Sequence, residues 1–285
     1  DKWIMEISLR SKKFSLDATG KVSVENITDA ALDYIERQKD EAFFLWLDYF
    51  EIHEPWDTPT EFTDLYGLNP EGRFVPMPSH GWTDATEADL QNHFAHYKGC
   101  ITQNDRQLGR ILRLLDELDL TERTVVMVVS DHGEPFGEHG TFRKFACPVY
   151  DELAKIVWIV RGPGVPARGG IDALACNVDF APTFLDLAGL PVPKDMHGRS
   201  LKPLLLGKAP ADWRTSFYYH YYEFPGAHSV RRHYGIRTTR YKLIHYYRIG
   251  EWELFDLEKD PHELRNVYSD PAYAPIVAKL KTELE

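Results

Sequence analysis

Residues 124–134 read Thr-Val-Val-Met-Val-Val-Ser-Asp-His-Gly-Glu, an apolar run that ends abruptly in polar side chains. A run of this length without polar alternation is typical of a strand buried on both faces of a sheet. Asp131 and His132 follow it directly, and open parallel sheets bind ligands beyond the carboxyl ends of their strands. Gly133 permits a bend here, so the carboxylate and the imidazole can both turn toward one metal ion.

Two similar apolar runs flank this stretch, at residues 42–47 and 155–160, and the second is closed by a Gly-Pro-Gly turn. Apolar residues at helical spacing predict a long helix over 86–118 and a shorter one over 28–38. Strands separated by helices indicate an α/β fold with a mostly parallel sheet and helices on both faces. Residues 51–85 contain five prolines and little periodicity, which predicts a long surface loop.

The composition of the sequence changes near residue 210. Aromatic-rich segments at 216–222, 234–238 and 241–247 predict closely spaced antiparallel strands, and a final amphipathic helix is expected from about 273 to 285. We therefore expect an α/β domain over residues 1–210 and a C-terminal α+β subdomain over 211–285. We interpret the tyrosines of these strands as core and sheet-face packing rather than as a binding platform.

Composition excludes several classes of function. The chain has 285 residues with 33 Lys+Arg against 44 Asp+Glu, a net charge of −11, which argues against a general nucleic-acid binder. Its three cysteines cannot form a complete disulfide framework. Its longest apolar runs fall short of the roughly 18 residues that a membrane span needs. Neither a compartment nor an oligomeric state is assigned.

The loop after residue 130 concentrates chemically active side chains. Its fourteen residues from 131 to 144 include Asp131, His132, Glu134, Glu138, His139, Arg143 and Lys144. That density, interleaved with glycines, favours a functional loop over a purely structural one. His53 lies in the other strand-end loop, where we expect it to approach Lys144 across the sheet. Cys147 is interpreted as a small packing residue because no motif supports its activation as a nucleophile.

Several motifs occur in a characteristic order. They are Phe43–Trp56 with its histidine, Ser130–Glu134, Gly137–Gly140, Lys144, Tyr150–Leu153, Arg161–Gly164, Val178–Gly189, His197–Leu201 and Glu253–Pro261. In this order the chain resembles the type I sulfatases and their relatives, the phosphonate monoester hydrolases and phosphodiesterases of the alkaline-phosphatase superfamily. The resemblance implies an alkaline-phosphatase-like α/β/α sandwich, incomplete at its N-terminal side, with a small C-terminal antiparallel sheet and a helix.

The resemblance also implies roles for individual residues. Asp131 and His132 would be ligands of one divalent metal, with Ca²⁺ favoured by carboxylate ligation and Mn²⁺ an alternative because of the histidine. Lys144 would hold a non-bridging oxygen of the sulfate group, and His53 would contact the bridging oxygen of the ester. His139 is a further candidate for substrate binding. The implied substrate is a small-molecule or carbohydrate sulfate ester.

Three features of the family are missing from the sequence. No Cys or Ser is followed by x-Pro-x-Arg, the motif whose Cys or Ser becomes the formylglycine nucleophile, and the Asp-Asp metal pair and the Gly-Lys-Trp-His-type segment are also absent. We therefore expect a C-terminal portion of a sulfatase, with formylglycine in a preceding segment, that is inactive by itself. A phosphonate monoester or phosphodiester hydrolase, and a non-catalytic relative, are the alternatives.

Overall fold

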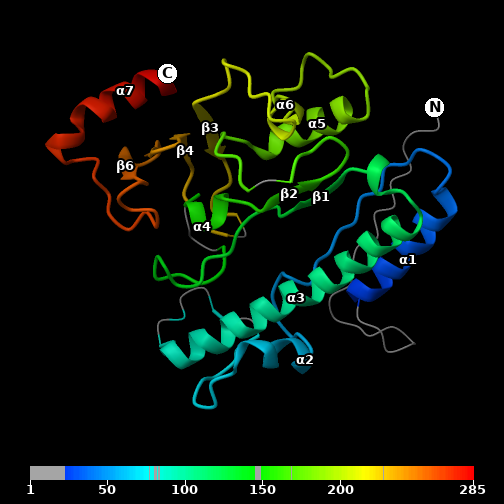
Figure 1. Cartoon of the computed structure of the whole chain (residues 1–285). Coiled ribbons are helices and arrows are strands. Elements are labelled where there is room, and N and C mark those ends of the chain that lie inside the picture. Colours follow the sequence, from blue (N-terminus) through cyan, green and yellow to red (C-terminus); the bar gives the residue numbers. More distant parts are fainter. Residues whose placement is uncertain are drawn as a thin grey trace. The chain divides into compact units, whose positions relative to one another are not determined.

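The computed structural model describes residues 23–285 except positions 77, 80, 81, 83, 145–148, 168 and 227. The chain forms two compact units, residues 1–125 and residues 126–285 (Figure 1). None of the helices within the described ranges is long and apolar enough to cross a membrane.

The described part of the first unit contains two long helices. α1 (Ser23–Gln38) and the long α3 (Glu87–Glu117) lie alongside each other in Figure 1, and Arg110 of α3 donates to Asp29 of α1 at 2.6 Å. Thr86 and Asp89 cap α3 reciprocally, each side chain accepting the other residue's backbone N–H. The apolar side chains buried in the two helices include Ile27, Ala31, Ile35, Ile111, Leu114 and Leu115. Both predicted helices are confirmed, although the first begins at Ser23 rather than Thr28.

The buried strand predicted over residues 42–47 is wrong. These residues are extended but form no strand, with a single bridge at Asp48, and the Trp46 side chain is 42% exposed. A strand exists only when neighbours complete its hydrogen-bonded ladder, and none of the strands in the described ranges pairs with this segment. In the described residues of 51–85 the predicted loop is confirmed apart from α2 (Thr60–Thr63) and the 3₁₀ turn η1 (Asp64–Tyr66).

The second unit opens, after the turn η2 (Thr121–Arg123), with a pair of short strands, β1 (Val126–Val129) and β2 (Trp158–Arg161). The strands were predicted, but they pair antiparallel rather than parallel, and Ile159 is 60% exposed rather than buried. A parallel pair needs a crossover that is usually helical. In the described residues of the connection between these strands the one helix is α4 (Asp151–Ala154), which is too short for such a crossover.

Residues 176–214 contain three short helical elements and a buried carboxylate, that of Asp179. The segment comprises η3 (Asn177–Asp179), α5 (Phe180–Leu187) and α6 (Lys202–Leu205). The fully buried Asp179 carboxylate accepts the N–H groups of Cys176 and Arg199 and a two-pronged bond from Arg214 at 2.5 and 2.6 Å. These four donors explain how a carboxylate can be buried here, because each of its oxygens is hydrogen-bonded.

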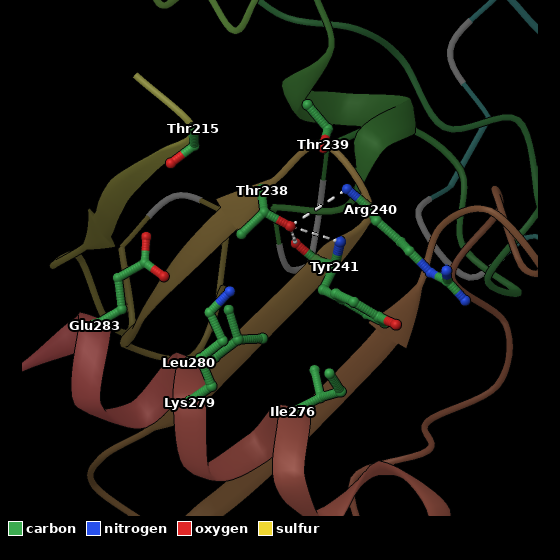
Figure 2. A pocket seen from close by; sticks show the side chains of 9 residues that line it. All are labelled: Thr215, Thr238, Thr239, Arg240, Tyr241, Ile276, Lys279, Leu280 and Glu283. Carbon is green, nitrogen blue, oxygen red and sulfur yellow. Dashed lines mark hydrogen bonds between the residues drawn. The ribbon is translucent and has the colours of Figure 1, made fainter. Parts of the chain in front are cut away.

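The C-terminal sheet confirms the prediction of antiparallel aromatic strands. Its order is β3 (Ser216–Tyr221), β4 (His233–Thr238), β5 (Tyr241–Tyr246) and β6 (Glu251–Asp256). After the turn η4 (Pro271–Tyr273), α7 (Ala274–Leu284) packs Leu280 into a core with Ile236, Leu243 and Leu254. Beside α7, the Thr238 hydroxyl accepts the N–H of Tyr241 at 2.8 Å within a pocket of about 250 Å³ (Figure 2).

Candidate active site

The segment that carries Asp131 and His132 is fixed by backbone contacts to residues just before β2. The Ser130 N–H donates to Val157 O at 3.1 Å, which ends the ladder of β1. Gly133 then lies so close to α4 that its N–H donates to Leu153 O at 2.7 Å, and a Cβ at this position would meet Glu152 O at 1.9 Å. Only glycine allows this approach, so the sequence Asp-His-Gly fixes where the two polar side chains begin.

Three of the predicted site residues lie together in this unit. His132 Nδ1 lies 2.7 Å from Gly133 O, and because a carbonyl can only accept, Nδ1 is the donor. His132 Nε2 therefore presents its lone pair, which faces Lys144 Nζ at 3.0 Å. Asp131 Oδ2 lies 3.6 Å from the same Nε2, on a side chain that is 87% exposed.

This arrangement fits part of the ligand shell of a divalent cation. A carboxylate oxygen and an imidazole lone pair, 3.6 Å apart, are donors of the kind that Ca²⁺ or Mn²⁺ accepts. The ammonium of Lys144 interacts with the lone pair that a metal would use, so His132 cannot bind both cations through Nε2 at once. Across the described positions, no group of three or more His, Cys, Asp or Glu side chains gathers around one point. Asp131 and His132 thus supply two ligands of a larger shell.

His139 is held by a residue that the sequence did not single out. Its Nε2 lies 3.3 Å from Glu152 Oε2, and its ring stacks on Tyr150 with 4.0 Å between centroids. The other oxygen of Glu152 lies 3.0 Å from Nδ1 of His262, so one largely buried carboxylate joins two imidazoles. The signal that could have identified Glu152 is its place in the Tyr-Asp-Glu-Leu motif, which begins six residues after the candidate lysine. Glu152 orients His139 without lying in the metal pair.

His53 lies in the other unit, and its local geometry repeats that of His132. Its Nδ1 lies 2.7 Å from Glu54 O, the carbonyl of the next residue, as Nδ1 of His132 does from Gly133 O. The ring also stacks on Phe50 at 4.6 Å, and the buried Glu54 carboxylate lies 3.3 Å from Nδ1. In both histidines, therefore, Nδ1 is held by the backbone carbonyl of the next residue. The approach of His53 to Lys144 stays a prediction.

Two of the three cysteines have described surroundings. Cys100 is buried, with its Sγ 2.6 Å from the Thr58 hydroxyl, and burial raises the pKa of the Cys176 thiol. Neither is an activated thiolate on this evidence. Cys147, interpreted as a packing residue, lies outside the described residues.

Comparison with known proteins identifies the family. The family model for sulfatases matches residues 2–190. The chain belongs to the sulfatase family. A second model, the C-terminal region of N-sulphoglucosamine sulphohydrolase, matches residues 137–285. The motifs quoted from the sequence therefore identified the family correctly, and members of the sulfatase family generally use a divalent metal and formylglycine.

Individual relatives and solved structures agree with this sulfatase assignment. The chain is 44% identical over 199 residues to N-acetylglucosamine-6-O-sulfatase of Bacteroides thetaiotaomicron, covering 68% of this chain and 35% of that protein. It is 32% identical over 232 residues to arylsulfatase K of Rattus norvegicus, covering 79% and 38%. The chain thus spans between a third and two fifths of the length of these two relatives.

The structural matches confirm an alkaline-phosphatase-like α/β fold. A protein solved in complex with its substrate D-glucosamine-2-N,6-O-disulfate superposes with a TM-score of 0.75 and 30% identity, over 93% of this chain and 69% of that one. The phosphonate monoester hydrolase of Silicibacter pomeroyi superposes with a TM-score of 0.79 and 25% identity, over 95% and 63%. The fold class predicted from the sequence is confirmed, with its small C-terminal antiparallel sheet.

Proposed function

We propose that this chain carries part of the active site of an enzyme that hydrolyses sulfate esters of glucosamine-containing carbohydrates. The observation that carries the proposal is the convergence of Asp131, His132 and Lys144 on one imidazole nitrogen, in a chain of the sulfatase family. The substrate class is supported by the names of two relatives, a sulfatase of N-acetylglucosamine and a protein solved with a disulfated glucosamine.

The charges of these groups suit sulfuryl transfer. A sulfate ester carries negative charge on its peripheral oxygens, and fixed positive charge stabilises that charge most where it grows in the transition state. We assign Lys144 to a non-bridging oxygen and Asp131 and His132 to the metal, which would supply a second positive charge to the same group. His139, held by Glu152 at 3.3 Å, is assigned to substrate binding.

His53 is assigned to the bridging oxygen of the ester. A departing alkoxide needs a proton, and a positioned imidazole can donate it. Nδ1 of His53 is committed to the Glu54 carbonyl at 2.7 Å, so Nε2 is the nitrogen that would transfer the proton. The carboxylate of Glu54 lies 3.3 Å from the same Nδ1.

The remaining parts of the proposal concern the metal, the nucleophile and the domains. We favour Ca²⁺, with Mn²⁺ as the alternative that a histidine ligand supports. The 285 residues contain no Cys/Ser-x-Pro-x-Arg motif, so the formylglycine would come from sequence outside them, and the chain alone would not turn over substrate. Residues 1–210 would belong to the catalytic domain and residues 211–285 to its C-terminal subdomain.

The phosphonate monoester hydrolase is the second candidate because of its structural match, and a non-catalytic relative is the third. Sequencing upstream of the codon for Asp1 separates the enzymes from the non-catalytic reading. A reading frame that continues through Cys/Ser-x-Pro-x-Arg supports an enzyme, and a frame without that motif contradicts one. The extended polypeptide is then assayed on glucosamine 6-sulfate and on a phenyl phosphonate monoester. Preference for the phosphonate would overturn the sulfatase proposal.

Metal binding is tested on the 285-residue chain itself. Calorimetric titration with Ca²⁺ and with Mn²⁺ should show binding that His132→Ala weakens at least about tenfold, because a ligand is lost. His197→Ala is the matched control, since His197 is an exposed histidine of the same unit. Equal affinity of the two variants would refute the assignment of His132.

A further inference from the structure

The C-terminal sheet has two faces of different character. One face carries Ile244, Tyr246 and Phe255, which pack with Tyr150 into a buried cluster. On the opposite face, α7 covers Ile236, Leu243 and Leu254. Toward the β3–β4 loop, the same face continues into further aromatic residues, of which Trp252 and Tyr268 also pack against the core under α7.

These residues form a row across all four strands. In the strand register, His220 of β3 lies opposite Tyr234 of β4, Tyr234 opposite His245 of β5, and His245 opposite Trp252 of β6. Three strand spacings extend over about 14 Å, which is the length of a short oligosaccharide rather than of one sugar ring. Four rings beside the row complete it, and we call the eight residues the aromatic band: Tyr218, His220, Tyr222, Tyr234, His245, Tyr247, Trp252 and Tyr268.

Neighbouring rings of the band stack on each other or are joined by hydrogen bonds. His220 stacks on Tyr222 with 3.7 Å between centroids, and His245 stacks on Trp252 at 3.8 Å. Hydrogen bonds join the polar edges, from the Tyr218 hydroxyl to His220 Nδ1 at 2.7 Å and between the Tyr234 hydroxyl and His245 Nδ1 at 2.8 Å. The band is therefore a preorganised surface, which reduces the entropy lost when a ligand binds.

Its outer end is open to solvent. Tyr218 is 56% exposed on β3, an edge strand of the sheet, and Tyr222, directly after this strand, is 67% exposed. Core packing explains buried rings but not two tyrosines that expose most of their surface on either side of His220. Tyrosines with an apolar ring and a polar edge are enriched at binding surfaces, and sugar rings offer the same combination of C–H faces and hydroxyl groups.

The charge around the band is suited to an anion. The carboxylates of β6 at this end, Glu251 and Glu253, alternate onto the opposite face, where Glu253 accepts the Tyr246 hydroxyl at 3.0 Å. On the side of the band, Lys281 Nζ lies 4.1 Å from the Trp252 centroid, and the Arg248 guanidinium lies 5.9 Å from that of Tyr247. These two cations are the groups beside the band that would attract a negatively charged ligand, although Glu223 follows Tyr222 and the chain has a net charge of −11.

We propose that the aromatic band binds the sugar rings of a sulfated oligosaccharide. The proposal rests on the proposed function, and it extends it from the ester that is cleaved to the chain that carries the ester. For the residues of the aromatic band, it replaces the interpretation of the tyrosines as packing alone. The rings stack on the sugars, and Lys281 and Arg248 attract their sulfate groups.

Binding is tested on the full 285-residue chain with a heparin-derived hexasaccharide, a chain of sulfated glucosamine and uronic acid units. Calorimetry should show binding that the double variant Tyr218→Ala/Tyr222→Ala weakens at least about tenfold, since stacked aromatic contacts are each worth of the order of 1 kcal/mol. Both tyrosines are exposed, so an unchanged melting temperature should show that the variant is folded. Tyr66→Ala, which removes a tyrosine that is 39% exposed in the other unit, should bind like the wild type.

Three results would overturn the proposal: wild type that does not bind the hexasaccharide, a double variant that binds it equally well, or a Tyr66 variant that is weakened as much. The metal titration separates this proposal from the proposed function. Metal binding by a chain that does not bind the hexasaccharide refutes the band alone. Hexasaccharide binding that depends on Tyr218 and Tyr222, in a chain that does not bind metal, refutes the metal site alone.

Discussion

Lys242 and Glu263 form a buried pair of side chains. The direction in which stability changes with pH shows whether burial or attraction between the two charges dominates the pKa of Glu263. Lys242 Nζ lies 2.7 Å and 2.9 Å from the two carboxylate oxygens of Glu263, and 2.7 Å from Asp151 Oδ1, while the side chains of Lys242 and Glu263 are 2% and 0% exposed. Attraction to the ammonium lowers the pKa of Glu263, and burial raises it. Burial is the larger effect, and it raises the pKa of Glu263 from 4.5 to about 7.

The magnitude follows from linkage. Between pH 4.5 and 7 the unfolded chain ionises Glu263 while the folded chain keeps it protonated. Glu263 therefore contributes stability that is complete below about pH 4.5 and is lost as the pH rises through 7. A pKa difference of this size corresponds to about 3 kcal/mol. In Glu263→Gln this contribution is absent, so the stability of the wild type relative to this variant should fall by about 3 kcal/mol between pH 4.5 and 8.

Subtracting the stability of Glu263→Gln from that of the wild type cancels the contributions of groups that titrate in both proteins. His233, whose pKa burial lowers, is unchanged in the variant, as is Tyr219, whose pKa burial raises. Hydrogen exchange of the Leu243 and Leu254 amides, in β5 and β6, reports the opening free energy of this sheet. A matched control replaces a surface partner, Glu258, whose side chain is 67% exposed, and should show no slope.

The reasoning is refuted by either of two results. A difference that does not depend on pH would mean that burial and attraction offset each other at Glu263. A difference that rises with pH would mean that attraction to Lys242 wins, because the folded pKa would then lie below the unfolded one.

Three further substitutions test the N-terminal cap of α3, the loop that carries Asp131 and His132, and the role of His53 as general acid. Thr86→Ala removes the α3 cap and should lower the free energy of unfolding by about 1 kcal/mol in urea, with recovery in Thr86→Ser, and no loss would contradict the capping. Gly133→Ala forces a Cβ to within 1.9 Å of Glu152 O and should abolish Mn²⁺ binding by calorimetry, whereas Gly169→Ala, in open space, should not. In a polypeptide that also carries the nucleophile, His53→Ala should lower kcat by about 10²–10⁴-fold, and an unchanged kcat would refute its role.

Local chemistry made much of this molecule predictable from its sequence. The long α3 follows from the spacing of its apolar residues and from Thr86 and Asp89, which satisfy each other's backbone within one turn. The strands β3, β4 and β5 follow from their aromatic, β-prone composition, whereas β6 was not predicted as a strand. Asp131, His132 and Lys144 were predicted to act together because only a short loop separates them, and the structure brings them together.

Non-local pairing was not predictable in the same way. Residues 42–47 have the composition of a buried strand, yet strand formation depends on partners that a segment does not contain. The same limit applies to β1 and β2, where the apolar runs gave the strands but not their antiparallel direction. Glu152 acquires its role only through His139 and His262, one of which lies 110 residues away in the chain. No periodicity or spacing rule contains that information.

Together these contacts make the C-terminal sheet a support of the metal loop rather than a separate appendage. Residues 150–153 contact the loop through Gly133 and His139, and they contact the sheet through Tyr150, packed on Phe255, and through Asp151, bonded to Arg237 at 2.9 Å. A side chain that positions a ligand must itself be fixed, and the fixing groups here belong to strands far along the sequence. Loosening the sheet should therefore displace the loop that carries Asp131 and His132 without touching either residue. The proposed metal pair would then depend on the aromatic strands as much as on the motif that contains it.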